Sequence, residues 1–218
     1  MSASVDNFLK TIYLISNEVQ GVVTGTLIAS RLNISAAAVT DMTRKLATRG
    51  LVNYTPYREI GLTTTGEQQA LKIVRRHRLW ELFLHETLGM DLKEVHDEAE
   101  RLEHHASDRL IDCIEQFLAH PRFDPHGEPI PDKNGMLTQI KDAIELIDAT
   151  PEADYIICSI RIQKSEVFDI FTHYDIRPGK HIKVVRRFDF DNSLEVQINN
   201  QNILLSNTLA CKILCTKN

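Results

Sequence analysis

Residues 24–50, TGTLIASRLNISAAAVTDMTRKLATRG, decide the fold of the first part of this chain. The segment predicts two helices, Thr24–Arg31 and Ala36–Arg49, separated by a turn of a few residues. Ser35 stands where a serine caps the start of the second helix, and Gly50 stands where a glycine ends it. A helix, a tight turn and a second helix form a helix-turn-helix motif, whose second helix enters the major groove of DNA.

The residues on either side of this motif complete a winged-helix unit. Asp6–Asn17 repeats apolar side chains at helical spacing and predicts a helix before the motif. After the motif, Leu51–Tyr54 and Ile60–Thr63 predict two short strands, which would be the wing. Residues 1–80 contain ten Lys and Arg against five Asp and Glu. This positive balance suits a polyanion, so the first part of the chain is predicted to bind DNA.

The second helix of the motif provides the side chains that would read DNA. Small residues at its start let the backbone approach the duplex, hydroxyl groups can bond bases or phosphates, and alanine methyls can touch thymine methyls. The basic residues that follow would bond phosphates. The alternative is a helical hairpin inside another kind of domain, but the turn, the wing and the charge agree on DNA binding. The candidates are Ser35, Ala36, Ala37, Ala38, Thr40, Asp41, Arg44, Lys45, Arg49 and Arg58.

A second informative stretch is Val95–Ser107, VHDEAERLEHHAS. On a helix, His96, Glu100 and either Glu103 or His104 would share one face, because residues three and four apart are neighbours. Histidine and carboxylate ligands suit a borderline or hard divalent cation. A solvated acidic face is the plainer interpretation, and spacing alone leaves the two equally open.

The helix that carries this stretch is predicted to run on to Leu118. Its apolar stripe is strong enough for a helix–helix or dimer interface. Before it, Thr65–Leu88 predicts one long helix in which His77 and Glu81 are one turn apart, so that a metal ion or a simple ion pair would suit them. Residues 81–120 contain eleven Asp and Glu against three Lys and Arg, in contrast to the basic first part.

The segment His120–Gly135 is predicted to be a boundary, since it holds four of the seven prolines. Asp124 and His126 within it are two further candidate ligands, although ordinary linker polarity explains them as well. Met136–Ile147 predicts a short helix.

The remainder of the chain changes to short strands separated by polar turns, which suggests a small barrel. It shows no glycine-rich phosphate loop and no nucleophile arrangement, so no enzyme is predicted. The class is therefore mainly α with a β C-terminal domain, divided at 1–72, 73–150 and 151–218. The predicted strands are Tyr155–Ile162, His181–Phe190, Leu194–Ile198, Asn202–Ser206 and Ala210–Thr216.

The N-terminal residues and the cysteines bear on the location of the protein. No basic region precedes an apolar run at the N-terminus, so no signal peptide is predicted. No stretch reaches the apolar length of a transmembrane helix. The four cysteines are scattered without a paired CxxC pattern, which fits reduced thiols. We therefore expect a cytoplasmic protein without a membrane partner.

Three motifs carry a resemblance to a known family. HRLWELFL at 77–84, VHDEAERLEHHASD at 95–108 and FDPHGEPIP at 123–131 resemble the diphtheria-toxin-repressor and manganese-transport-regulator family. The resemblance covers essentially the whole chain. It implies a winged helix-turn-helix, a helical metal-binding and dimerisation domain and an SH3-like (FeoA-like) barrel. It also implies a homodimer that binds a palindromic operator in double-stranded DNA.

The resemblance implies two neighbouring metal sites. The first would use Glu100, Glu103 and His104 with a residue of the first helix. That position falls on Asn7, where the manganese branch usually has Asp and the iron branch Met; Asp6 is the alternative. The second site has two variants in the family. One would use His77, Glu81 and His96. The other would use Glu81 with Asp124, His126 and Glu166.

The resemblance and the ligand chemistry together favour Mn(II). Position 100 is Glu, where the iron-responsive relatives carry Cys, and a shell of oxygen and imidazole ligands suits Mn(II). Fe(II), Co(II) and Zn(II) remain candidates, and Zn(II) would bind tightly by the Irving–Williams order. The prediction is a Mn(II)-dependent repressor of metal-uptake genes. Its competitors are an Fe(II)-dependent repressor, a winged-helix regulator of an organic ligand, a di-metal hydrolase and a metal-buffering protein; the DNA-binding unit argues against the last two.

Overall fold

A computed structural model describes residues 3–18, 22–55, 59–161 and 165–218 of the chain, and the side chains of residues 165 and 166 are not part of that description. The chain divides into two compact units. The first comprises residues 1–80, 97–120 and 131–137, and the second comprises residues 81–96, 121–130 and 138–218. None of the helices in the described ranges is both long and apolar enough to span a membrane. The predicted class, mainly α with a β C-terminal domain, is confirmed.

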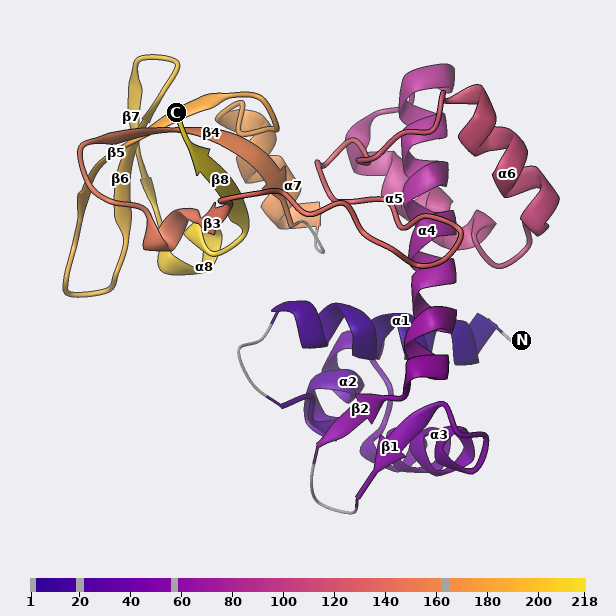
Figure 1. Cartoon of the computed structure of the whole chain (residues 1–218). Coiled ribbons are helices and arrows are strands. Elements are labelled where there is room, and N and C mark those ends of the chain that lie inside the picture. The colour runs from indigo at the N-terminus through magenta and orange to yellow at the C-terminus, as the bar shows by residue number, and fades with distance from the viewer. Residues whose placement is uncertain (1–2, 19–21, 56–58, 162–164) are drawn as a thin grey trace. The chain divides into compact units, whose positions relative to one another are not determined.

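The winged helix forms as predicted (Figure 1). Ser35 caps the second helix of the motif by accepting a hydrogen bond from the Ala38 amide at 3.2 Å. Thr24 caps the first helix in the same way, through the Leu27 amide at 3.3 Å. The elements are α1 (Ala3–Glu18), α2 (Gly25–Leu32), α3 (Ala36–Thr48), and the antiparallel strands β1 (Val52–Tyr54) and β2 (Ile60–Leu62).

One apolar core joins the elements of the winged helix. Phe8 and Leu9 of α1 are buried together with Val39 and Leu46 of α3, and residues of α2, the wing and the start of the next helix pack in the same cluster. Because interiors of this kind are close-packed, this core holds α1 and α3 in one arrangement relative to each other.

Three helices follow the wing: α4 (Thr64–Leu88), α5 (Leu92–Leu102) and α6 (Asp108–Phe117). The long helix α4 is confirmed, but a single helix from Val95 to Leu118 is wrong. The chain turns at residues 103–107, where Ser107 has an extended backbone and caps α6 by accepting from the Leu110 amide at 3.2 Å. Glu103 and His104 therefore lie in a corner after α5, not along its face.

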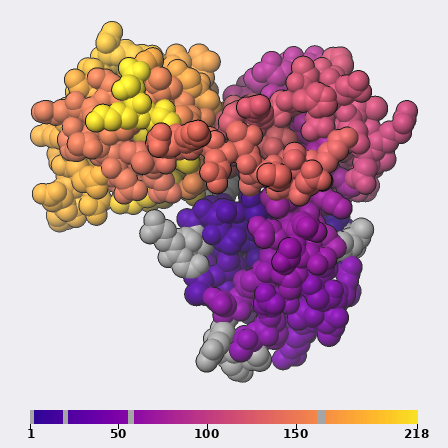
Figure 2. Space-filling model, in the orientation of Figure 1, coloured from indigo at the N-terminus to yellow at the C-terminus, as the bar shows by residue number. Residues whose placement is uncertain are grey.

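The second unit contains a six-stranded antiparallel sheet in the order β3-β8-β4-β5-β6-β7 (Figure 1). Bulges in β4 and β5 interrupt the register, and bulges of this kind bend strands as a barrel requires. The C-terminal residues, yellow in Figure 2, lie at the surface of this unit. The elements are β3 (Ile144–Glu145), a 3-10 turn (Leu146–Asp148), β4 (Ala153–Ile160), α7 (Ser165–His173), β5 (His181–Arg187), β6 (Leu194–Ile198), β7 (Gln201–Leu205), α8 (Asn207–Ala210) and β8 (Ile213–Lys217).

The expected helix Met136–Ile147 is wrong. Asp142 has a φ of 58°, which a right-handed helix cannot accommodate. Ile144 and Glu145 instead pair with β8 at the edge of the sheet, and Leu146 is fully buried in the core of this unit. Within residues 136–147, Leu146 and Ile147 enter this core, whereas Met136, Leu137 and Ile144 are exposed, so the apolar residues do not form one buried helical face.

Residues 120–135 of the described chain form no helix or strand, and Gly127 in this proline-rich segment packs closely against β4. Gly127 has a φ of +77°, and a Cβ atom there would lie 2.1 Å from the carbonyl oxygen of Cys158 in β4. Only glycine accommodates both the positive φ and this close approach. The turn that contains Asp124 and His126 is therefore held against the sheet within the second unit.

The Cys215 thiol of β8 is expected to resist modification in the folded protein. Burial raises its pKa to about 12, so the reactive thiolate is a negligible fraction at pH 8. A thiol reagent followed by mass spectrometry of the Cys215 peptide should show labelling only as fast as the protein unfolds. Rapid labelling in native buffer, at the rate seen in denaturant, would contradict this burial.

Candidate metal centre

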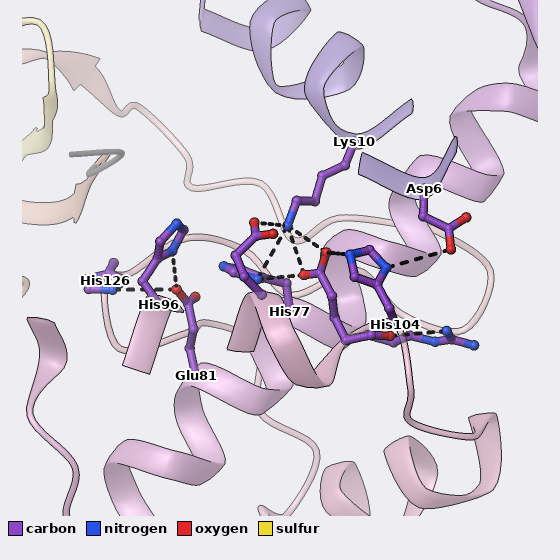
Figure 3. A network of polar contacts seen from close by, with 10 residues as sticks. Asp6, Lys10, His77, Glu81, His96, His104 and His126 are labelled. Carbon is purple, nitrogen blue, oxygen red and sulfur yellow. Dashed lines mark hydrogen bonds and ion pairs between the residues drawn. The ribbon is translucent and has the colours of Figure 1, made fainter. Parts of the chain in front are cut away.

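The first unit gathers Glu100, Glu103 and His104 into one group. His104 is labelled in Figure 3. Glu100 lies on α5, and the other two lie in the corner before α6. One ligand atom from each residue lies within 4.8 Å of the others, a spacing at which a single ion can be shared. The corner brings Glu103 and His104 to the group without requiring that both lie on one helical face.

Glu103 is the most deeply buried acidic side chain of this group, with a side-chain exposure of 0%. A buried carboxylate requires partners. Its two oxygens accept from the Lys10 ammonium at 2.9 and 2.8 Å, and Oε2 lies 2.7 Å from Nδ1 of His77. His77, predicted for the second site, thus contacts a residue of the first group.

Lys10 of α1 was not predicted as part of the site. Its side chain is 7% exposed, and its ammonium lies 2.5 Å from Oε1 of Glu100 and 3.5 Å from Nδ1 of His77. One signal in the sequence pointed to it: Lys10 follows Asn7 by three residues, so both lie on the same side of α1. A lysine within an otherwise apolar helical stretch is a further indication of a buried partner.

Three buried atoms of His104 and Asn7 have no hydrogen-bond partner among the described residues. In the described part of the chain, neither ring nitrogen of His104 makes a hydrogen bond, although both are buried. Nε2 lies 3.3 Å from Oε1 of Glu103, and Nδ1 lies 3.8 Å from Oδ2 of Asp6. The side-chain oxygen of Asn7 is likewise buried without a hydrogen-bond partner among the described residues. Oxygen and imidazole donors with unused lone pairs suit a divalent cation.

Arg76 fixes the corner that carries Glu103 and His104. Its guanidinium donates to the Glu103 carbonyl oxygen at 3.3 Å and to Asp108 at 2.6 Å. The same contact holds the pKa of Asp108 below its usual value, since the cation favours the charged carboxylate. The corner is thus bound at both ends by one side chain of α4.

The second unit brings together another set of predicted ligands. Oε1 of Glu81 lies 3.0 Å from Nδ1 of His96 and 4.0 Å from Nε2 of His126. Asp124 is buried, and its Oδ1 accepts from the amides of His126 and Glu128, which shapes the turn. Glu166 lies in α7, and its side chain is outside the described part of the chain.

The DNA-reading candidates lie on the exposed side of α3. Ser35, Ala36, Ala37, Ala38, Asp41, Arg44, Lys45 and Arg49 are all exposed, and Thr40 is half-buried. The Thr40 hydroxyl donates to the Ala36 carbonyl at 3.0 Å, so it remains able to accept. Val39 and Leu46, on the opposite side, are in the core. Arg58 lies outside the described residues.

The sequence matches three domain families. Residues 1–60 match the iron dependent repressor N-terminal DNA-binding domain, and residues 63–132 match the metal-binding and dimerisation domain of the same repressors. Residues 144–217 match the FeoA domain. The three matches follow one another along nearly the entire chain.

Relatives and solved structures agree with these matches. The diphtheria toxin repressor of Corynebacterium diphtheriae is 30% identical over 95% of this chain and 94% of its own length. An HTH-type transcriptional regulator of Methanocaldococcus jannaschii is 41% identical over 54% of this chain and 94% of its own length. A solved manganese-dependent transcriptional repressor in complex with manganese is 32% identical, with a TM-score of 0.91 over 98% of this chain and 100% of that chain. The chain therefore belongs to the diphtheria-toxin-repressor family of metal-dependent transcriptional repressors, which are not enzymes.

Proposed function

We propose that this chain is a Mn(II)-dependent repressor of metal-uptake genes. The observation that carries the metal assignment is the donor set of the first group, in which Glu100, Glu103 and His104 offer carboxylate oxygen and imidazole nitrogen. Donors of this kind suit Mn(II), whereas a thiolate would favour softer metals. Similar solved proteins include manganese-dependent repressors, which supports the same assignment.

The first group would couple the metal to the DNA-reading helix. When bound, the ion would supply the positive charge that cancels repulsion among the carboxylates. Glu100 would hold it from α5, Glu103 and His104 from the corner before α6, and Asn7, or Asp6 in its place, from α1. Because α1 shares its core with α3, a fixed α1 favours one position of the reading helix.

We propose that a second ion is held in the second unit. Oε1 of Glu81 lies 3.0 Å from Nδ1 of His96 and 4.0 Å from Nε2 of His126, and Asp124 lies two residues from His126. Glu166 is the proposed acidic ligand from α7. The distance from Glu81 to His126 supports the variant that uses the linker pair, and the distance from Glu81 to His96 supports the variant that uses His96.

The repressor is proposed to bind a palindromic operator as a homodimer in the cytoplasm, where the chromosome lies. A dimer would place two α3 helices in successive major grooves, about 34 Å apart. On α6, Leu110 is 44% exposed and Phe117 is 67% exposed, so apolar side chains are available for a partner subunit. Residues 73–150 would carry this interface, between a DNA-binding domain at 1–72 and the SH3-like domain at 151–218.

Mn(II) is expected to activate operator binding at a free concentration within its physiological range. The other metals are expected to activate only above their physiological ranges. The test selects an operator from random duplexes with the metal-loaded protein. It then measures duplex binding by fluorescence anisotropy while buffered Mn(II), Fe(II), Co(II) or Zn(II) is raised. Because Zn(II) binds tightly at almost any such site, activation rather than affinity is the deciding quantity.

The outcomes separate the candidate functions. Activation by Fe(II) alone would make the chain an iron-dependent repressor, like the relatives that bear that name. Full operator binding in the presence of chelator would favour a regulator of an organic ligand. Either result would overturn the manganese assignment.

A further inference from the structure

Lys10 places a positive charge among the oxygens that are proposed to bind the metal (Figure 3). Its ammonium donates to Oε1 of Glu100 at 2.5 Å and to both oxygens of Glu103 at 2.9 and 2.8 Å. These contacts use all three donors of the ammonium. The lysine therefore places a positive charge at oxygens of two of the three candidate ligands.

We propose that Lys10 is a tethered competitor of the metal, which sets the metal concentration at which the repressor switches. The inference rests on the proposed metal-dependent function and concerns the first group alone. Its basis is that one set of carboxylate oxygens serves two cations, the lysine ammonium and the divalent ion.

The two cations exclude one another at Glu103. A metal ion would bind the same Glu103 oxygens that now accept hydrogen bonds from Lys10. Two positive charges at neighbouring positions in a buried site also repel strongly, because the low dielectric screens them little. The ammonium must therefore leave Glu103 when the ion binds, and the long flexible lysine stem allows this.

Burial gives the lysine-bound form a stability of its own. Glu103 is 0% exposed, so without Lys10 its charge would depend on His77 at 2.7 Å. Removing one partner of a buried ion pair leaves an uncompensated charge, which is costly. An ion that binds Glu103 would therefore have to displace the Lys10–Glu103 ion pair.

Lys10 and Asn7 also give α1 two alternative attachments. They lie three residues apart on one side of the helix. Lys10 attaches α1 to Glu100 and Glu103 in the form described here, whereas Asn7, whose oxygen is buried without a hydrogen bond among the described residues, would attach it through the ion. Exchange between the two attachments would be the switching event.

Lys10→Met is expected to bind Mn(II) more tightly and to be less stable without it. If Lys10 contacts Glu103 in about nine-tenths of the protein molecules without metal, removing the lysine raises the affinity for Mn(II) about tenfold. Isothermal titration calorimetry with Mn(II) alone measures the affinity. Thermal unfolding in chelator measures the stability, and the Tm is expected to fall by about 5 °C or more. Lys10→Gln, which keeps donors for Glu103, provides a second variant if Lys10→Met does not fold.

Lys133→Met is the matched control, because it removes an exposed lysine whose ion pair with Asp112, at 3.3 Å, does not involve the metal group. It should change neither quantity. Unchanged or weaker Mn(II) binding by both Lys10 variants, with normal binding by the unmodified protein, would overturn the role of Lys10 and leave the proposed function standing. No Mn(II) binding by any of the proteins would overturn both.

Discussion

Metal-dependent operator binding is expected to be lost when Glu103→Gln and His104→Ala are combined. The two substitutions remove a carboxylate and an imidazole from the group of three ligands whose atoms lie within 4.8 Å. Loss of a residue that only supports a metal ligand already costs about 10–100-fold in affinity, so loss of two ligands should cost more than about 100-fold. Calorimetry with Mn(II) measures this loss, and anisotropy with the operator measures its effect on DNA binding.

The design of this experiment has to separate metal loss from misfolding. Glu103→Gln also removes the charge that Lys10 contacts, so His104→Ala alone serves as the milder variant that keeps that ion pair. Glu94→Gln with His105→Ala is the matched control, because both residues are exposed and border the same segment. Circular dichroism and sedimentation should show an unchanged fold and dimer. Operator binding that still responds to Mn(II) in the double variant would refute the proposed switch.

Arg44→Glu with Lys45→Glu is expected to abolish operator binding at unchanged metal affinity. Both side chains are exposed on α3, beyond the small residues at its start. If they bond phosphates, their loss reduces the slope of log K against log salt by about one for each contact. Reversal of both charges adds repulsion, so affinity at physiological salt should fall about 100-fold or more. Salt titrations of duplex binding measure both quantities.

A matched charge change elsewhere tests whether the position matters. Lys141→Glu with Lys217→Glu makes the same change in net charge at two exposed residues of the second unit. Operator affinity should stay within a few-fold of the unmodified protein. An equal loss in both variants would mean that overall charge, rather than α3, determines DNA binding.

Local signals were sufficient for the winged helix. Ser35 and Gly50 mark the ends of α3, and the alternation of apolar and polar positions separates its buried side from its exposed side. These signals depend on neighbours in sequence, which is why the predicted elements agree with α1, α2, α3 and the wing within a few residues.

Predicting the metal group required knowledge of contacts between residues that are distant in sequence. Glu100, Glu103 and His104 could be named from their motif, but the prediction assumed one continuous helix. The cap at Ser107 was present in the sequence, yet the strong apolar stripe of α6 hid it. Lys10 was missed because its partners are about ninety residues away, and nothing near it in sequence identifies Glu100 or Glu103 as the charges it meets.

The C-terminal sheet shows the same limit. The five long strands were predicted from their alternation, whereas β3 is only two residues long and depends on its pairing with β8. The helix α7 was also missed, although Val167, Phe168 and Phe171 recur at helical spacing in its sequence. Short edge strands and connecting helices gain most of their stability from tertiary packing, which no local pattern contains.

The shared core of α1 and α3 also has an evolutionary and practical consequence. The residues proposed to sense the metal and those proposed to read DNA project from different helices, while the buried positions between them hold both helices in register. Substitutions at positions 7 and 10 can therefore retune the response, and substitutions at the exposed positions 35–38, 41, 44 and 45 can retarget it, without one change undoing the other. Evolution or protein design can therefore change the metal-sensing residues and the DNA-reading residues separately, provided that the apolar residues between the two helices are left unchanged.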